Sequence, residues 1–177
     1  ATALSAASYQ RVLGANERIN LGIIGCGSRG HGAHMKGIHK HDAAENVQFT
    51  AVCDPWKLHR ERAAQSVKER YGIDARQFES YQDLLALEDV DAVMIASCDH
   101  QHCTHLEAAA KAKKDAYCEK PLAMTLEELK SACDAVKASG IIVQIGTQSR
   151  SYPGMVGVKK LYETGALGQI SRVEQMR

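Results

Sequence analysis

The sequence lacks the features that mark several broad classes of protein. No apolar run reaches the roughly 18 residues that a membrane-spanning helix needs, so no membrane partner is expected. Lys and Arg number 22 against 21 Asp and Glu, and no basic stripe is present, so nucleic acid is not an expected partner either. The chain has no internal repeat and no low-complexity linker. Its 177 residues are 45% hydrophobic, enough for one domain with a sizeable core and a little more chain.

Six cysteines are present, but no two are spaced as C-x-x-C and none follows the rhythm of a disulfide framework. Four of them follow predicted strands and are expected to be small, buried and reduced: Cys26, Cys53, Cys98 and Cys118. A redox or metal cluster at that edge is the alternative. Residues 98–105 gather three histidines and two cysteines, yet no second ligand pair is evident elsewhere, so no metal site is predicted.

The most informative stretch runs from Ile19 to Asp54. A short apolar run, residues 19–24, is typical of a buried strand, and a G-x-G-x-x-G turn follows it directly. A helical segment to about Lys40 and a second strand, residues 47–53, come next. A turn of this kind between strand and helix predicts a dinucleotide-binding site on the helix N-terminus. The candidate cofactor-binding residues of the turn are Gly25, Cys26, Gly27, Ser28, Arg29 and Gly30.

Asp54 closes the second strand and is a further candidate cofactor contact. A carboxylate there can accept the hydroxyls of an adenine ribose and would repel the 2′-phosphate of NADP, so NAD is the expected cofactor. Lys57, His59 and Arg60 follow closely. They could form an ordinary solvated helix start or accommodate a phosphate, so NADP stays open as an alternative.

Beyond Asp54, apolar strand patterns alternate with helical ones along the chain. This alternation predicts an α/β fold, a doubly wound parallel sheet of the Rossmann type, with ligands at the carboxyl ends of the strands. Strands are expected at 92–96, 115–118, 141–146 and 170–176, and helices at 58–71, 81–87, 102–113, 125–139 and 155–164. The helix at 125–139 carries a capping box, and Gly72 and Gly140 are expected to end two of the helices.

Three loops after predicted strands supply the remaining candidates. Ser97, Asp99 and His102 are candidate cofactor contacts near the nicotinamide; alternatively Asp99 caps a helix and His102 is a surface histidine. In the next loop Glu119 and Lys120 are candidate cofactor contacts, and they precede Pro121, which biases Lys120 away from helix. A lysine held near a nicotinamide can polarise a substrate hydroxyl or relay its proton, so Lys120 is the candidate catalytic residue, with a surface ion pair as the alternative. The third loop offers Gln148 to the cofactor and Arg150 and Tyr152 to a substrate, or is simply a polar loop.

These motifs together resemble the Gfo/Idh/MocA oxidoreductases, the glucose–fructose oxidoreductase and inositol dehydrogenase group, over residues 19–177. The likeness is carried by the glycine turn, Asp54, the D-x-x-H of residues 99–102, E-K-P at 119–121 and residues 146–150 and 165–170. It departs from the family at Cys98, where proline is usual, and at Lys113, where glycine is common.

The resemblance implies an NAD(P)-binding domain at 19–150 and, from residue 151, the start of an α+β substrate domain that continues beyond Arg177. It also implies that Lys120 touches both nicotinamide and substrate, that substrates are sugars, inositols or related polyols, and that the missing sheet forms a homo-oligomer. The expected activity is hydride transfer from a CH–OH group. An NAD-dependent glycosidase with transient hydride transfer and a non-catalytic dinucleotide-binding fragment are the alternatives.

The first residues, 1–18, are expected to form a tail. Their small, weakly apolar start is similar to the processed end of a twin-arginine export signal, which favours a periplasmic or secreted protein. Six unpaired cysteines favour the cytoplasm instead.

Overall fold

The computed structural model describes residues 17–174. Most of the predicted tail, residues 1–16, and the last three residues lie outside that range. The chain divides into two compact units between Gly146 and Thr147, and each unit is described by itself. The first contains the sheet and every helix up to residue 139.

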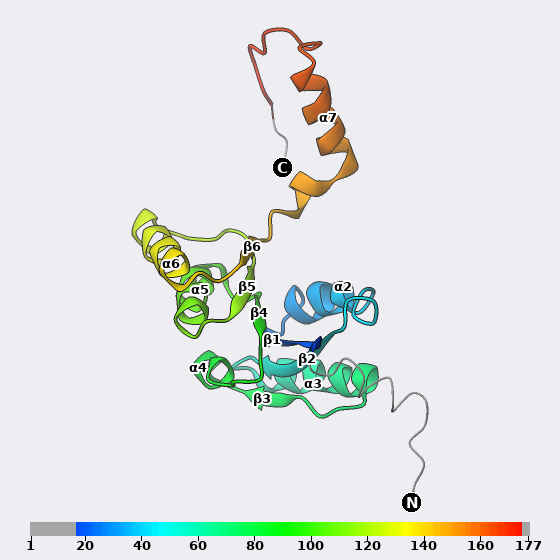
Figure 1. Ribbon diagram of the computed structural model, residues 1–177, viewed down its shortest axis with the longest axis vertical. Helices are drawn as coiled ribbons and strands as arrows, with labels where there is room; N and C mark the ends of the chain where they lie inside the picture. Colours follow the sequence, from blue (N-terminus) through cyan, green and yellow to red (C-terminus); the bar gives the residue numbers. More distant parts are fainter. Residues whose placement is uncertain (1–16, 175–177) are drawn as a thin grey trace, which may run out of the picture. The chain divides into compact units, whose positions relative to one another are not determined.

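A six-stranded, fully parallel sheet forms the centre of the first unit (Figure 1). Its strands are β1 (Ile19–Ile24), β2 (Val47–Cys53), β3 (Arg76–Phe78), β4 (Ala92–Ile95), β5 (Asp115–Cys118) and β6 (Val143–Ile145). Their order across the sheet is β3-β2-β1-β4-β5-β6, so the winding direction reverses between β1 and β4. This is the doubly wound Rossmann topology predicted from the alternation, and in such sheets ligands bind at the carboxyl edge beside the reversal.

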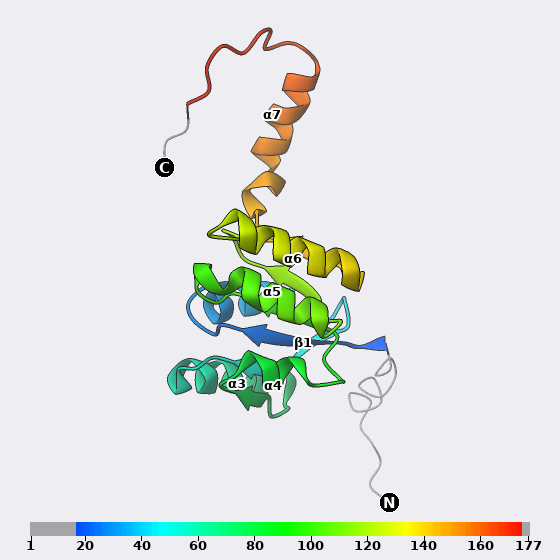
Figure 2. The ribbon, with the colours of Figure 1, turned by 90° about the vertical axis from the view of Figure 1, so that its left-hand side faces the viewer.

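Helices cover both faces of this sheet and bury two separate apolar clusters. They are η2 (Gly30–Met35), α2 (Lys36–Ile38), α3 (Lys57–Tyr71), α4 (Tyr81–Leu85), η3 (Asp99–Gln101), α5 (His102–Lys111) and α6 (Leu126–Ser139). Met35 of η2 and Val67 of α3 pack against one face, whereas α4, α5 and α6 pack against the other, which faces the viewer in Figure 2. No helix within residues 17–174 has both the length and the apolar character of a membrane span.

An irregularity in β2 fixes which of its residues face each cluster. Leu21 of β1 pairs with Phe49, but the next residue, Gly22, pairs with Ala51, so Thr50 is an extra residue in β2. Such a bulge shifts the alternation by one position. Phe49 and Val52 therefore share one cluster although they are three residues apart, while Ala51 belongs to the other.

The helix α6 begins and ends as its sequence predicts. The Thr125 hydroxyl accepts a hydrogen bond from the Glu128 amide (3.2 Å), and the Glu128 carboxylate accepts one from the Thr125 amide (3.3 Å). At the other end Gly140 has a φ of 74°, a left-handed conformation that glycine adopts without strain. The capping box and the glycine stop are both confirmed.

One prediction about secondary structure is confirmed and one is corrected. The helical segment after the glycine turn runs over residues 30–38, of which 30–35 form a π-helix and 36–38 an α-helix. The strand predicted at 170–176 is absent from residues 170–174, which pair with no strand among the described residues. A strand needs a hydrogen-bonded neighbour, so apolar residues alone do not create one. The short edge strand β3, by contrast, was not predicted.

Lys113 is a residue where the chain departs from the family pattern, and its backbone shows the consequence. Its φ is 58°, in the left-handed region where glycine carries no steric penalty. The Lys113 ammonium donates to the carbonyl of Ser139, 2.9 Å away at the end of α6. The lysine therefore ties the α5–β5 turn to the neighbouring helix.

The second unit, described over residues 147–174, contains η4 (Gln148–Ser151) and α7 (Pro153–Glu163). Pro153 occupies the first turn of α7, where its missing N–H has no intrahelical partner to lose. The predicted domain boundary at residue 150 stays a prediction.

Replacing Thr125 by Ala is expected to lower the free energy of unfolding by about 1 kcal/mol, because the Glu128 amide loses its acceptor. Urea denaturation of both proteins measures the difference. Thr104→Ala, at an exposed site inside α5, is the matched control and should cause no comparable loss. Equal losses in the two variants would show that the cap is not the source of the stability.

Candidate active site

A cavity of the first unit, which we call the main cavity because the predicted site residues line it, lies at the carboxyl edge of β1, β2 and β4, beside the reversal of the winding. Its volume is about 590 Å³. The residues that follow three strands line it: Gly25, Gly27, Ser28 and Arg29 after β1, Asp54 and Trp56 after β2, and Ala96, Ser97 and Cys98 after β4. Gln101, His105, His59 and Tyr81 complete much of the wall. The fold thus brings the predicted glycine turn, Asp54 and Ser97 to one cavity.

The three glycines of the turn serve different purposes. A Cβ atom on Gly30 would lie 1.9 Å from the Gly25 carbonyl oxygen, and one on Gly25 would lie 2.6 Å from the Ala96 backbone. These two glycines are therefore required by the protein's own packing. A Cβ on Gly27 would meet nothing closer than the His59 ring at 3.6 Å, an ordinary contact. The protein itself does not need glycine at position 27, and its absent side chain leaves the backbone open to a ligand in the cavity.

The Asp54 carboxylate holds the glycine turn and the next loop together. It accepts hydrogen bonds from the amides of Cys26 (2.8 Å) and Trp56 (2.9 Å). The carboxylate is nearly buried, yet it lines the cavity and retains further lone pairs for hydroxyl donors. Sequence reasoning assigned Asp54 a ligand contact and missed this second role. Cys26 contributes its amide to this bond, and burial beside Asp54 raises the pKa of its thiol well above the usual range.

The cations after Asp54 are mostly turned away from the cavity. Arg60 is buried and donates to the Asp54 backbone carbonyl at 2.6 Å and to the Glu79 carboxylate at 3.1 Å. Lys57 lies 3.7 Å from the Glu61 carboxylate on the outside of α3. Only His59 lines the cavity, with its Nδ1 atom 3.5 Å from the Asp54 carboxylate. No arginine or lysine of this group neutralises that carboxylate directly.

Aromatic rings form the outer wall of the cavity, which the sequence did not reveal. The Trp56 and His59 rings lie 4.2 Å apart between centroids, and the Tyr81 and His105 rings 4.3 Å apart. His105 Nδ1 also bonds the Ser97 hydroxyl at 2.9 Å. Burial, aided by the nearby His102 and His100, lowers the pKa of His105 to about 4. Its neutral ring is therefore the form that the folded chain favours.

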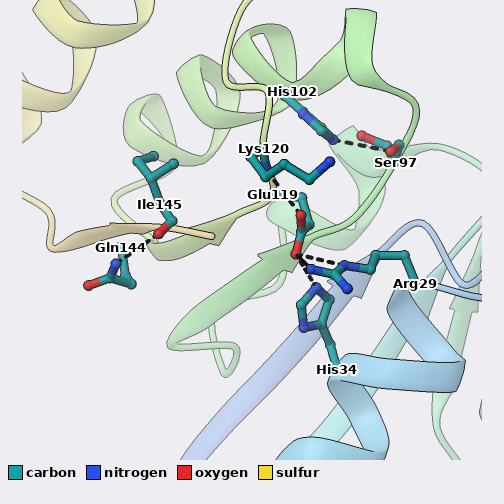
Figure 3. Close-up of polar contacts among 8 residues, drawn as sticks. All are labelled: Arg29, His34, Ser97, His102, Glu119, Lys120, Gln144 and Ile145. Atoms are coloured by element: carbon teal, nitrogen blue, oxygen red, sulfur yellow. Dashed lines mark hydrogen bonds and ion pairs between the residues drawn. The ribbon is translucent and has the colours of Figure 1, made fainter. Parts of the chain in front are cut away.

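Glu119 is held in a buried network at the end of β5 (Figure 3). Its Oε1 atom accepts from Arg29 Nε and His34 Nε2, both at 2.8 Å, and its Oε2 atom accepts from the Lys120 amide at 3.1 Å. Burial alone would raise the pKa of Glu119, but the Arg29 and Lys120 bonds outweigh it and the pKa is lowered. Burial also lowers the pKa of His34 in spite of Glu119, which favours a neutral ring that donates through Nε2. Arg29 thereby links the glycine turn to the segment that carries Lys120.

Lys120 is exposed, and its side chain extends past Glu119 (Figure 3). Within residues 17–174 its ammonium makes no hydrogen bond or ion pair, so the alternative of a surface ion pair receives no support. Because its side chain is exposed and its ammonium is unpaired within residues 17–174, Lys120 is available to a ligand at the carboxyl edge.

The peptide bond between Lys120 and Pro121 is cis.

Several predicted residues lie elsewhere. His102 is not a surface histidine, because only 1% of it is exposed, and Asp99 does not cap α5 through its side chain. Cys98 is exposed on the cavity wall, contrary to the expectation that it is buried, because it follows β4 by three residues and lies in a loop. All six cysteines are free thiols, and no group of three or more potential metal ligands exists within the described range.

Gln148, Arg150 and Tyr152 belong to the second unit, all three exposed in and after η4. Their predicted contacts with cofactor and substrate stay predictions.

Comparison with known proteins agrees with this geometry. The family GFO_IDH_MocA, described as an oxidoreductase family with an NAD-binding Rossmann fold, matches residues 19–147. The chain belongs to the Gfo/Idh/MocA oxidoreductase family. The family predicted from the sequence is therefore confirmed.

Individual relatives cover a similar region. Inositol 2-dehydrogenase of Salmonella paratyphi B is 32% identical over 152 residues, which make up 85% of this chain and 43% of that protein. Inositol 2-dehydrogenase/D-chiro-inositol 3-dehydrogenase of Lactiplantibacillus plantarum is 32% identical over 88% of this chain and 43% of its own. Among solved structures, WlbA dehydrogenase of Bordetella pertussis with NADH and UDP-GlcNAcA superposes with a TM-score of 0.73, at 28% identity, over 86% of this chain and 44% of WlbA. This Gfo/Idh/MocA chain thus spans less than half the length of these relatives.

Gly27→Ala is expected to leave the free energy of unfolding nearly unchanged but to weaken dinucleotide binding at least about tenfold, or roughly 1.4 kcal/mol, because the added methyl group occupies the cavity. Titration with NADH and urea denaturation measure the two quantities. Gly30→Ala is the matched contrast: the clash with the Gly25 carbonyl should destabilise the fold by about 3 kcal/mol. An unchanged NADH affinity in Gly27→Ala would show that the dinucleotide does not bind in this cavity.

His105 is expected to make stability depend on pH. Its pKa falls from 6.5 to about 4 on folding, so its contribution is complete above pH 6.5 and is lost as the pH drops towards 4. The loss attributable to this ring should be about 2 kcal/mol. Urea denaturation at pH 7 and pH 4.5 should show a smaller loss in His105→Gln than in the parent protein. Identical losses would contradict a neutral, buried His105.

Proposed function

We propose that this chain is the cofactor-binding part of an NAD-dependent dehydrogenase that oxidises a hydroxyl of an inositol, sugar or related polyol. The observation that carries the proposal is Gly27, a glycine that the fold does not require, opening onto a cavity bordered by Asp54 and the end of β4. Membership of the Gfo/Idh/MocA family and the inositol dehydrogenases among its relatives support it. The inositol or sugar class is taken from those relatives.

Asp54 and the glycine turn would bind different parts of the dinucleotide. The end of the turn, residues 27–30, suits the diphosphate, because the first N–H groups of a helix have no intrahelical partner and can bind an anion. Asp54 has lone pairs left for ribose hydroxyls. Within residues 17–174 no arginine or lysine forms an ion pair with the Asp54 carboxylate, which disfavours a 2′-phosphate and supports NAD over NADP. Ser97, Asp99 and Gln148 are proposed as further cofactor contacts. Glu119 is 3% exposed and bonded through both carboxylate oxygens, so we propose that it acts on the site through Arg29 and Lys120.

Lys120 is the proposed catalytic residue. The nicotinamide, when bound, supplies the hydride acceptor for the carbon that carries the reacting hydroxyl. When Lys120 is in its neutral amine form, a substrate hydroxyl placed at its nitrogen can pass the proton to that nitrogen as the hydride leaves for the nicotinamide, so that a carbonyl forms. The absence of any partner for the Lys120 ammonium among the described residues supports this role. Arg150 and Tyr152 are proposed as substrate contacts from the second unit.

Assembly and location belong to this proposal only as predictions from the family likeness. They comprise a homo-oligomer built through a further sheet domain and a periplasmic or secreted location, with the cytoplasm as the alternative.

The proposal is tested by a two-channel assay on the full-length protein with NAD. One channel follows nicotinamide reduction with a panel of inositols and free sugars, and the other follows aglycone release from aryl glycosides. Reduction without release is expected. Aglycone release without net nicotinamide reduction would instead identify a glycosidase that uses a transient hydride transfer. NAD binding with neither reduction nor release would favour a non-catalytic module. Lys120→Ala should abolish reduction while leaving NAD affinity nearly unchanged.

Replacing Asp54 tests cofactor choice. Asp54→Asn should weaken NAD binding about tenfold and NADP binding far less, because the variant loses the charge but keeps one acceptor for a backbone amide. Isothermal titration with both cofactors measures the ratio. Equal losses for the two would show that Asp54 does not contact the ribose.

A further inference from the structure

His102 makes two hydrogen bonds that its sequence position did not suggest. Its Nδ1 atom lies 2.6 Å from the Pro121 carbonyl oxygen and its Nε2 atom 3.1 Å from the Ser97 carbonyl oxygen. Only 1% of the residue is exposed, and it does not line the main cavity. The imidazole therefore bridges the loop after β4 to the segment after β5. Figure 3 shows its contact with Ser97.

We infer that His102 is a positioning residue that fixes the Lys120–Pro121 segment against the Ser97 loop and so sets where Lys120 meets the cofactor. This inference rests on the proposed function, since it concerns the approach of Lys120 to the dinucleotide. It replaces a direct cofactor contact by His102 with an indirect role. The ring is too deeply enclosed for such a contact, and both of its nitrogens are already engaged.

The segment around Lys120 is held at both ends, which gives the bridge its importance. On one side Glu119 is bonded by Arg29 and His34. On the other side Pro121 is bonded by His102, and the Cys103 thiol reaches the Leu122 carbonyl at 3.2 Å. Lys120 lies between these anchors with its own ammonium unpaired within the described residues. Releasing one anchor should change the position of the lysine without removing any group from the cavity wall.

The chemistry of the two bonds suggests a pair of complementary variants. A carbonyl oxygen only accepts, so each contact is a hydrogen bond only when the ring nitrogen in it carries a proton; a neutral imidazole has one such nitrogen and an imidazolium has two. In His102→Asn the side-chain amide nitrogen stands near the position of Nδ1 and can still reach Pro121. In His102→Gln it stands near the position of Nε2 and can still reach Ser97. One variant thus keeps the anchor beside Lys120, and the other loses it.

The experiment measures acetylation of Lys120 by limiting acetic anhydride, with and without NAD, by mass spectrometry of the peptide that contains it. In the parent protein NAD should slow the reaction severalfold. His102→Asn should retain this protection, whereas His102→Gln and His102→Ala should lose most of it while binding NADH with unchanged affinity. His100→Ala, at an exposed position two residues earlier, is the control and should behave as the parent.

Each result bears on the inference. Full protection in His102→Gln and His102→Ala would overturn it, as would equal loss in the Asn and Gln variants. If the parent protein binds no NADH, the proposed function fails, and amide hydrogen exchange without cofactor then decides the inference. Exchange of residues 119–124 should be faster in His102→Gln than in His102→Asn, and equal rates in the two would overturn it. Thermal unfolding identifies a variant that has merely failed to fold.

Discussion

The site depends on the close approach of the glycine turn to the end of β4. Gly25 leaves so little space against the Ala96 backbone, and Gly30 so little against the Gly25 carbonyl, that no side chain fits at either position. This contact brings the turn beside the point where the sheet reverses its winding, between β1 and β4. Asp54 then fastens the turn from the β2 side through the Cys26 amide. The cavity lies between these contacts, and Gly27 lines it without a side chain that would fill it.

A second constraint connects that turn to the reactive lysine. Arg29 lines the cavity and at the same time bonds the buried Glu119, the neighbour of Lys120. An anion bound at the turn and the carboxylate of Glu119 would therefore both interact with the Arg29 guanidinium. Together with the His102 bridge, this arrangement places the lysine by contacts that begin on three different strand ends. The segment is thus positioned by the sheet rather than by its own local conformation.

Much of the fold follows from patterns that are local in the sequence. The strands at residues 19–24, 47–53 and 115–118, the capping box of α6 and its terminal glycine are all set by neighbouring residues, and the structure places them as predicted. The bulge at Thr50 and the short strand β3 depend on partners distant in sequence, so local patterns do not reveal them. The same holds for the site. Glycine and aspartate positions identify the cavity, but the aromatic wall and the roles of Arg29, His34 and His102 arise only when separate loops meet.

The most direct test of the account is a titration of the protein with NADH and NADPH followed by tryptophan emission. Trp56 is the one tryptophan in the sequence, and it lies on the cavity wall beside Asp54, so its emission reports on this cavity alone. The account predicts saturable quenching by NADH and at least tenfold weaker binding of NADPH, or about 1.4 kcal/mol. Equal affinity for both cofactors, or no saturable change with either, would contradict it.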